Sequence, residues 1–206
     1  MKRICRIAVL VSGGGTNLQA ILDAQRSGVI TSGRVEIVIS NKQDAFALQR
    51  AEKAGVKTCV IFKKELGSQS AFENKLIETI QNENIDLIVL AGFMVILSKA
   101  FTDAFPNRII NVHPSLIPSF CGEGYYGLKV HEEALKYGVK VTGATVHFVN
   151  EIPDGGAIID QKAVRVLKND TPETLQKRVM KNAEWIILPR AIQSVSKKIC
   201  AEGERK

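Results

Sequence analysis

The amino-acid sequence predicts an α/β fold built on an open, mostly parallel, Rossmann-like sheet, with helices on both faces and an antiparallel C-terminal extension. Two observations lead to this prediction. In the first half of the chain, short runs rich in Val and Ile alternate with segments of helical periodicity, which is the pattern of parallel strands joined by crossover helices. In the second half, two strand-like runs flank a short glycine-containing turn, as antiparallel neighbours do.

Five runs in the first half are almost entirely apolar, which is typical of strands buried on both faces of a parallel sheet. They span residues 6–11, 35–40, 58–61, 87–91 and 109–112. Between them, apolar side chains recur at helical spacing and form three stripes that a helix would bury. The stripes are Leu18, Ile21 and Leu22, then Ala47, Ala51 and Ala54, then Phe72, Leu76, Ile77 and Ile80. Right-handed crossovers are expected between the strands.

The second half opens with a loop rich in Pro and Gly over residues 114–127, and a helix is predicted at 128–137. Strands are predicted at 141–149 and 157–166, on either side of a turn at 153–156.

A last helix is predicted to begin after Thr171, with Pro172 at its first position. Its capping box is expected to be incomplete, because Thr174 stands where Glu is preferred. Pro189 is expected to end or kink this helix. No internal repeat or linker is evident, so residues 1–206 are expected to form one domain.

The composition is that of a globular protein in a reducing compartment. Hydrophobic residues make up 45% and charged residues 24% of the chain, and the longest apolar run is too short to span a bilayer. The apolar stretch after the basic first residues is also too short for an export signal. The four cysteines are scattered without a Cys-x-x-Cys pair, which favours free thiols. We therefore expect a cytoplasmic protein that does not engage a membrane.

The formal net charge of +7 suggests anionic partners. No basic stripe interleaved with aromatic residues is evident, so nucleic acid is not expected as a partner. A phosphorylated metabolite, a polyanionic cofactor or simply a basic surface would account for the charge equally well. The three histidines lack the close spacing of a zinc site, and no metal is expected. His131 is predicted to lie at the surface, and His147 to be packed inside or behind a site.

A glycine-rich loop, Ser12-Gly13-Gly14-Gly15-Thr16-Asn17, lies between the first predicted strand and the first helix. Backbone N–H groups in that position, at a helix N-terminus, form a cradle for a phosphate. Leu18 stands where a dinucleotide fingerprint needs its third glycine, and a Walker lysine is absent. The loop therefore favours a phosphate on a mononucleotide-sized ligand, with a plain tight turn as the alternative.

Three polar residues suggest acyl-transfer chemistry. Asn111 and His113 lie at the end of the fifth predicted strand and on the same face of it, where ligands of open α/β sheets bind. Asp154 lies in the turn 153–156. An Asn amide can stabilise an oxyanion, a His can act as general acid or base, and an Asp can hold the imidazole charged or orient a water. A turn-forming Asn, a strand-capping His and an ordinary hairpin turn are the alternatives.

These residues closely resemble those of the folate-dependent phosphoribosylglycinamide formyltransferases of purine synthesis, over nearly the whole chain. The resemblance is carried by the glycine loop as far as Ile21 and by Leu90-Ala91-Gly92-Phe93-Met94, Asn111-Val112-His113-Pro114-Ser115-Leu116-Ile117-Pro118, Thr145-Val146-His147-Phe148-Val149 and Asp154-Gly155-Gly156. It implies a formyltransferase fold that transfers a formyl group from 10-formyltetrahydrofolate to the amine of glycinamide ribonucleotide. It further implies a catalytic trio of Asn111, His113 and Asp154.

The resemblance also implies how the two small-molecule substrates are held. Gly15, Thr16 and Asn17 would bind the ribonucleotide phosphate, with Glu184 near the acceptor. The reduced folate would lie against Met94, Val95, Ile96 and Leu97, near Asn111 and the loop before Asp154. Residues 1–110 would then be the phosphate-binding half and 111–206 the catalytic and folate-binding half, in a monomer or weak homodimer.

This chain departs from the family pattern at three places. Val95 stands where the family often has Arg, and Gln69 replaces an Arg that is sometimes associated with the folate tail. Residues 121–127 form a longer insert, expected to be a variant flexible loop over the site.

Three other functions remain as alternatives. Formyltetrahydrofolate deformylase shares the Asn, His and Asp logic but usually carries a preceding regulatory domain, and methionyl-tRNA formyltransferase carries an additional C-terminal domain. The third alternative, from a different class, is a non-catalytic nucleotide-binding or folate-binding module, for which the trio would be coincidental.

Overall fold

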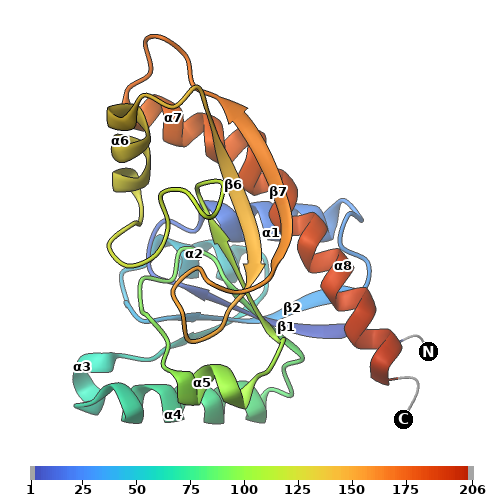
Figure 1. The fold of residues 1–206 in the computed structure, drawn as a ribbon. Helices are drawn as coiled ribbons and strands as arrows, with labels where there is room; N and C mark the ends of the chain where they lie inside the picture. Colours follow the sequence, from blue (N-terminus) through green and yellow to red (C-terminus); the bar gives the residue numbers. More distant parts are fainter. Residues whose placement is uncertain (1–2, 204–206) are drawn as a thin grey trace.

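The computed structural model describes residues 3–203, and its centre is one mixed sheet in the order β3-β2-β1-β4-β5-β6-β7 (Figure 1). The first five strands run parallel to one another, β6 is antiparallel to β5, and β7 is antiparallel to β6. The predicted fold class is therefore confirmed. The strands are β1 (Cys5–Val11), β2 (Gly33–Ser40), β3 (Lys57–Val60), β4 (Leu87–Leu90), β5 (Ile109–His113), β6 (Val141–Phe148) and β7 (Ile158–Arg165).

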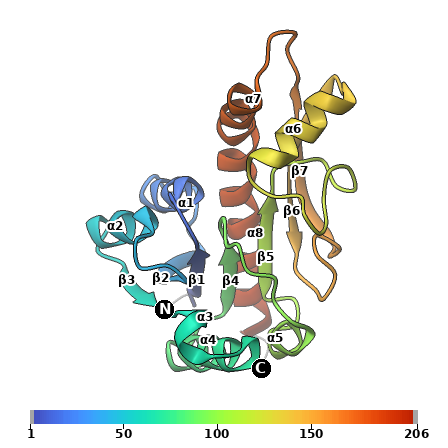
Figure 2. The ribbon, with the colours of Figure 1, turned by 90° about the vertical axis from the view of Figure 1, so that its left-hand side faces the viewer.

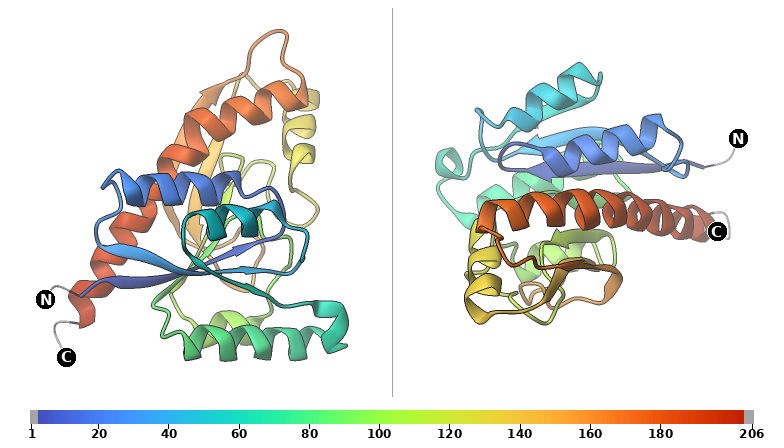
Figure 3. Two further views of the ribbon diagram at one scale, coloured as in Figure 1. Left: turned by 180° about the vertical axis from the view of Figure 1, so that it is seen from behind. Right: turned by 90° about the horizontal axis from the view of Figure 1, so that it is seen from above.

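Helices cover both faces of the sheet, as predicted (Figures 2 and 3). One face packs against α1 (Thr16–Arg26), α2 (Phe46–Lys53) and the long C-terminal helical segment, in a core that includes Ile21, Ala47 and Ile192. The other face packs against α4 (Gln69–Asn82) and α5 (Lys99–Ala104), through Phe72 and Phe101. The remaining helices before the C-terminal segment are α3 (Lys63–Leu66) and α6 (Leu128–Tyr137).

The two cores explain why the strand sequences are apolar without alternation. In β1, consecutive side chains from Ile7 to Val11 are all fully buried, because odd and even positions enter opposite cores. Burying an Ile, Leu or Val side chain contributes about 1.5–3 kcal/mol. This double burial fixes β1 and β4 at the centre of the sheet and leaves their carboxyl ends free to carry functional loops.

The C-terminal helical segment differs from its prediction in two ways. It consists of α7 (Pro172–Val179), a π-helical turn η1 (Met180–Glu184) and α8 (Trp185–Gly203). The capping box at Thr171 is complete, because the Thr174 hydroxyl accepts from the Thr171 N–H in the role of the preferred Glu.

Pro189 does not end the helix, which continues through it to Gly203. Pro cannot donate to the carbonyl one turn earlier, and its ring crowds that carbonyl. That carbonyl belongs to Trp185, the first residue of α8, which directly follows the π-helical turn η1.

Two short helices, α3 and α5, were not predicted from the sequence, because four and six residues are too few to show a periodicity. Within residues 3–203, no helix combines the length and apolarity needed to cross a membrane.

Candidate active site

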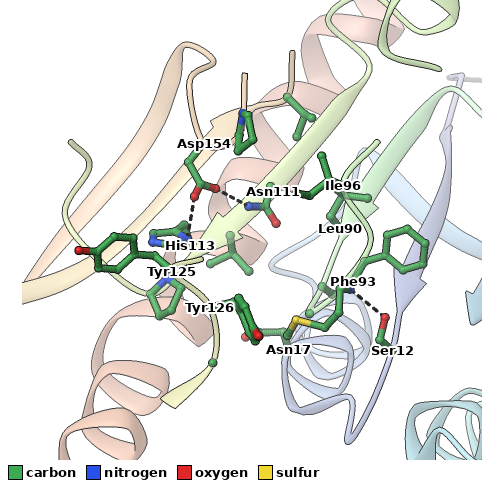
Figure 4. Close-up of a pocket in the computed structure, with 18 of the residues that line it drawn as sticks. Ser12, Asn17, Leu90, Phe93, Ile96, Asn111, His113, Tyr125, Tyr126 and Asp154 are labelled. Atoms are coloured by element: carbon green, nitrogen blue, oxygen red, sulfur yellow. Dashed lines mark hydrogen bonds and ion pairs between the residues drawn. The ribbon is translucent and has the colours of Figure 1, made fainter. Parts of the chain in front are cut away.

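A cavity of about 940 Å³ opens where the carboxyl ends of β1, β4 and β5 meet (Figure 4). Ligands of open parallel sheets bind at this edge. All the site residues predicted from the sequence line it: Gly15, Thr16, Asn17, Met94, Val95, Ile96, Leu97, Asn111, His113, Asp154 and Glu184. They come from segments far apart in the chain, so the fold brings together what the sequence separates.

Asn111, His113 and Asp154 form one cluster (Figure 4). The Asp154 carboxylate lies between the other two, with Oδ2 3.3 Å from His113 Nδ1 and Oδ1 3.5 Å from Asn111 Nδ2. Asp154 itself has a positive φ of 56°. At Gly156, a Cβ would lie 1.7 Å from the Phe148 carbonyl oxygen, so only glycine lets this turn fold back over the sheet.

His147 also belongs to this cluster. The sequence predicted only that this residue would be packed inside the protein or behind a site. It pairs with Asn111 across β5 and β6. Its Nε2 lies 3.2 Å from Asn111 Nδ2 and 3.5 Å from Asp154 Oδ1, and its Nδ1 lies 2.8 Å from the Phe148 carbonyl oxygen. A proton on Nδ1 satisfies that carbonyl and leaves Nε2 to accept from the Asn111 amide, whereas a second proton, on Nε2, makes that nitrogen a donor to Asp154. His147 therefore orients Asn111.

The electrostatics of the cluster keep a carboxylate beside an imidazole. Burial raises the pKa of Asp154, but the hydrogen bond with His147, the charge of His113 and the N–H of Gly122 together bring that pKa below its usual value. Asp154 is consequently ionised at neutral pH.

Burial lowers the pKa of His113, against the opposing effects of Asp154 and of the Phe120 carbonyl. Its Nε2 lies 2.9 Å from that carbonyl oxygen, and its Nδ1 faces Asp154. Both ring nitrogens thus face acceptors, and only the imidazolium form satisfies both. Burial and hydrogen bonding oppose each other here, and burial prevails, so the pKa of His113 lies below its usual value.

The glycine loop presents an uncapped helix N-terminus to the cavity. Gly15 is the N-cap of α1, in the left-handed conformation with φ 70°, and no side chain caps the helix. The first N–H groups of α1 therefore stay available to an anion. A Cβ on Gly15 would lie 2.6 Å from Ala47 Cβ, so the loop packs tightly onto α2. The Ser12 hydroxyl accepts from the Met94 N–H at 2.8 Å and ties this loop to the segment after β4.

Glu184 brings a buried carboxyl group to the same end of the cavity. It lies in η1, is only 6% exposed, and accepts a hydrogen bond from Asn17 Nδ2 at 2.7 Å. Burial raises the pKa of Glu184 to about 7, although the Asn17 hydrogen bond opposes the rise. The group is thus poised between its neutral and charged forms at physiological pH.

The segment after β4 gives the cavity an apolar wall. Met94 and Ile96 are more than half exposed, whereas Leu97 is buried and anchors the segment. The Gln69 amide donates to the Ile96 carbonyl oxygen at 3.1 Å and to Glu73 at 2.6 Å. Gln69 therefore holds the segment through its backbone and contributes no charge.

The prediction that His131 lies at the surface is wrong. His131 is fully buried and lines the cavity, and within residues 3–203 neither ring nitrogen has a hydrogen-bond partner. Burial lowers its pKa to about 4, and the charge of His113 acts in the same direction. The signal was present in the sequence, because His131 falls on the apolar stripe of α6 with Val130 and Ala134.

The insert 121–127 borders the cavity on its open side. Gly122, Gly124 and Gly127 all have positive φ angles, and the Gly122 N–H donates to Asp154 at 2.9 Å. Tyr125 and Tyr126 line the cavity, and Tyr126 is 63% exposed. The insert is thus attached to the Asn, His and Asp cluster at one end and presents aromatic side chains at the other.

Comparison with known proteins gives consistent results. A family model described as formyl transferase matches residues 5–192. The trifunctional purine biosynthetic protein adenosine-3 of Homo sapiens is 44% identical over 203 residues, which cover 98% of this chain but only 19% of that protein. The phosphoribosylglycinamide formyltransferase of Haemophilus influenzae is 42% identical over 188 residues, covering 91% of this chain and 85% of that one.

The solved structures agree. The crystal structure of glycinamide ribonucleotide transformylase 1 from Symbiobacterium toebii superimposes with a TM-score of 0.89 at 46% identity, and the match covers 95% of this chain and 89% of that chain.

Proposed function

The chain belongs to the formyl transferase family, and on this basis we propose that it transfers the formyl group of 10-formyltetrahydrofolate to the amine of 5′-phosphoribosylglycinamide. One observation carries the proposal. The Asn111, His113 and Asp154 cluster and an uncapped, glycine-rich helix N-terminus share one cavity. A phosphorylated acceptor and an acyl-transfer centre need this combination.

In this proposal the acceptor lies between the glycine loop and η1. The N–H groups of Gly15, Thr16 and Asn17 bind its phosphate, favoured by the positive end of the helix dipole. Glu184 accepts from the amine of the acceptor. Because its pKa is raised to about 7, its carboxylate is stabilised when a positively charged or hydrogen-bond-donating amine enters.

The folate lies against the apolar wall formed by Met94, Val95, Ile96 and Leu97, which accounts for the exposure of large apolar side chains inside a cavity. The Met94 N–H donates to Ser12 and the Ile96 carbonyl accepts from Gln69, so the other backbone polar groups of this segment, together with Asn111, are available for hydrogen bonds to the ring. Val95 offers no charge at this wall, so the binding there is apolar and through the backbone.

The chemistry forms one bond and breaks another. The amine nitrogen bonds to the formyl carbon, and the bond from that carbon to N10 of the folate breaks. The amine loses a proton, and N10 gains one. No nucleophilic side chain is required, because the amine attacks directly.

The cluster stabilises the charge that develops on the formyl oxygen. Asn111 donates an amide N–H to it, held in orientation by His147. His113, protonated on Nε2, donates from that nitrogen at the position that the Phe120 carbonyl oxygen now occupies. Asp154 stabilises the imidazolium and orients a water that carries the proton from the amine towards N10.

Within the proposal the two halves of the chain are interdependent. The glycine loop and the apolar wall come from residues 1–110, and the cluster and Glu184 come from 111–206. We place the protein in the cytoplasm, acting on these small molecules as a monomer or weak homodimer.

The direct test measures release of the deformylated folate from 10-formyltetrahydrofolate, with and without the ribonucleotide. Release that depends on the acceptor and falls by about a hundredfold or more in Asn111→Ala or Asp154→Asn supports the proposal. Asp160→Asn is a matched control, because Asp160 forms an ion pair with Arg190 outside the cavity. Release without acceptor would instead identify a hydrolase, and no release would leave a binding module.

A further inference from the structure

The glycine loop rests against helix α2, which lies beside α1 but does not line the cavity (Figure 3). Two carbonyl groups of the loop accept hydrogen bonds from this helix. The Ala47 N–H donates to the Gly13 carbonyl oxygen at 3.0 Å, and Arg50 Nε donates to the Gly14 carbonyl oxygen at 2.8 Å. The backbone of the loop is therefore oriented by α2, from outside the cavity.

These two contacts decide where the donors of the loop point. In a trans peptide, the C=O of one residue and the N–H of the next point in opposite directions. Because the Gly13 and Gly14 carbonyls are turned to α2, the N–H groups of Gly14 and Gly15 are turned away from it, towards the cavity that both residues line. Within residues 3–203, neither of these N–H groups has a hydrogen-bond partner. Both are thus free to bind an anion.

The peptide between Gly14 and Gly15 has little else to hold it. Glycine on both sides leaves this part of the backbone free to rotate, and a Cβ on Gly14 would find open space around it. Rotation of the peptide by half a turn would take the Gly15 N–H out of the cavity and put the Gly14 carbonyl oxygen in its place. That oxygen carries a partial negative charge and repels a phosphate. The anion site therefore depends on the hydrogen bond from Arg50.

Arg50 is itself held in place by its surroundings. Its stem lies against Gly15, since a Cβ on that glycine would lie 3.4 Å from Arg50 Cδ. The guanidinium lies over the Phe46 ring, 4.9 Å from its centroid, and Nη1 donates to Gln19 Oε1 at 3.1 Å. Within residues 3–203 the guanidinium forms no ion pair. Its planar fork thus reaches a carbonyl of the loop and a side chain of α1 at the same time.

We propose that Arg50 is a positioning residue for the acceptor, because it holds the Gly14 carbonyl against α2 and so keeps the Gly15 N–H turned towards the phosphate. The inference rests on the proposed function, since it assumes a phosphorylated acceptor at the glycine loop. Arg50 does not line the cavity and takes no part in the transfer step. Its loss should weaken only the binding of the phosphate, by about tenfold or more, as expected when a hydrogen bond from a charged group is lost.

The kinetic test compares 5′-phosphoribosylglycinamide with its dephosphorylated analogue as acceptors. Arg50→Met keeps an unbranched stem and removes the donors. It should lower kcat/KM for the phosphorylated acceptor by about tenfold or more, and leave KM for the folate and kcat/KM for the analogue as in the wild type. The matched control, Lys53→Met, removes an exposed cation from the same helix, outside the cavity, and should leave all three values unchanged.

An NMR test observes the loop directly and does not require turnover. Inorganic phosphate should shift the amide resonance of Gly15 in the wild type and in Lys53→Met, and much less in Arg50→Met. Without phosphate, rotation of the Gly14–Gly15 peptide should change the NOE between the Gly14 Hα and the Gly15 N–H in Arg50→Met alone.

Three outcomes would contradict these expectations. An equal loss with both acceptors would overturn the role of Arg50, because it would show a general effect on the fold. A loss confined to the phosphorylated acceptor, with an unchanged NOE, would also overturn it, since Arg50 would then act through its charge alone. No turnover by the wild type with either acceptor would overturn the proposed function, while the phosphate titration would still test whether Arg50 positions the loop.

Discussion

Glu184 offers a sharp test of the site, because its burial has a predictable cost in stability. The perturbation is Glu184→Gln, which keeps the size of the side chain and an oxygen that can accept from Asn17. Burial raises the pKa of Glu184 from 4.5 to about 7 in the folded protein. That difference corresponds to about 3 kcal/mol by which the ionised side chain destabilises the folded state.

The sign of the pH dependence follows from proton binding. Between pH 4.5 and about 7 the folded protein binds more protons at Glu184 than the unfolded chain does. Stability from this group is therefore fully present below the unfolded pKa and is lost as pH rises through the folded pKa. Glu184→Gln removes this loss of stability at high pH, because the Gln side chain does not ionise. The variant should match the wild type near pH 4 and exceed its free energy of unfolding by up to about 3 kcal/mol near pH 8.

The assay is urea unfolding of both proteins at a series of pH values, read as the difference between them. The difference matters because His131, whose pKa is lowered to about 4, acts with the opposite sign over much of the same range. In a plot of wild-type unfolding free energy against pH, the slopes due to Glu184 and His131 offset each other. Subtracting this curve from that of Glu184→Gln leaves the contribution of Glu184. A difference that does not change with pH, or that favours the wild type near pH 8, would refute the reasoning.

A second buried glutamate supplies the control. Glu73 is 4% exposed and accepts from the Ser98 N–H, the Ser98 hydroxyl and the Gln69 amide. Glu73→Gln would place an N–H₂ group, itself a donor, against these donors and is expected to cost about 1–3 kcal/mol of unfolding free energy.

In the catalytic assay, Glu184→Gln should also raise KM for the acceptor by about tenfold or more, since it removes a charged partner of the amine.

Three further outcomes are expected. Gly15→Ala should lose at least about 1 kcal/mol of stability in urea unfolding, because it forces a Cβ into the left-handed region and against α2, whereas Gly13→Ala, with open space around its Cβ, should behave as the wild type. His131→Leu should be the more stable protein below pH 6.5, by up to about 3 kcal/mol near pH 4, because a buried His with a pKa of about 4 loses stability as pH falls through that window. Asp154→Asn should lower the pKa of His113 further in an NMR titration, since it removes the charge that favours the imidazolium; a rise would contradict the assigned ion pair.

Much of the fold was predictable because a strand that is buried on both faces of a sheet is apolar at successive positions. The runs that became β1 and β4 are apolar without alternation, and only central parallel strands require that. The placement of Asn111 and His113 on one face follows from the two-residue period of a strand. The glycine loop was predictable as well, since three consecutive glycines join the end of the first strand to a helix N-terminus.

What escaped prediction depends on contacts between distant segments. His147 lies opposite Asn111 only because β5 and β6 pair in one particular register, and the sequence of a strand does not state its register. The apolar stripe of α6 indicates that His131 is buried, but no local pattern specifies that α6 packs against α7.

The π-helical turn η1 has a consequence for the spacing of the chain. Such a turn contains one residue more than regular α-helix requires. Loss of any one residue from Met180–Glu184 would let α7 and α8 merge into an unbroken helix, and everything on one side of the junction would rotate by about 100° relative to the other. The helix would become more regular, and the Glu184 carboxyl group would lose its hydrogen bond with Asn17. The extra residue thus works as a spacer between two helical registers, one facing α6 and one facing the sheet.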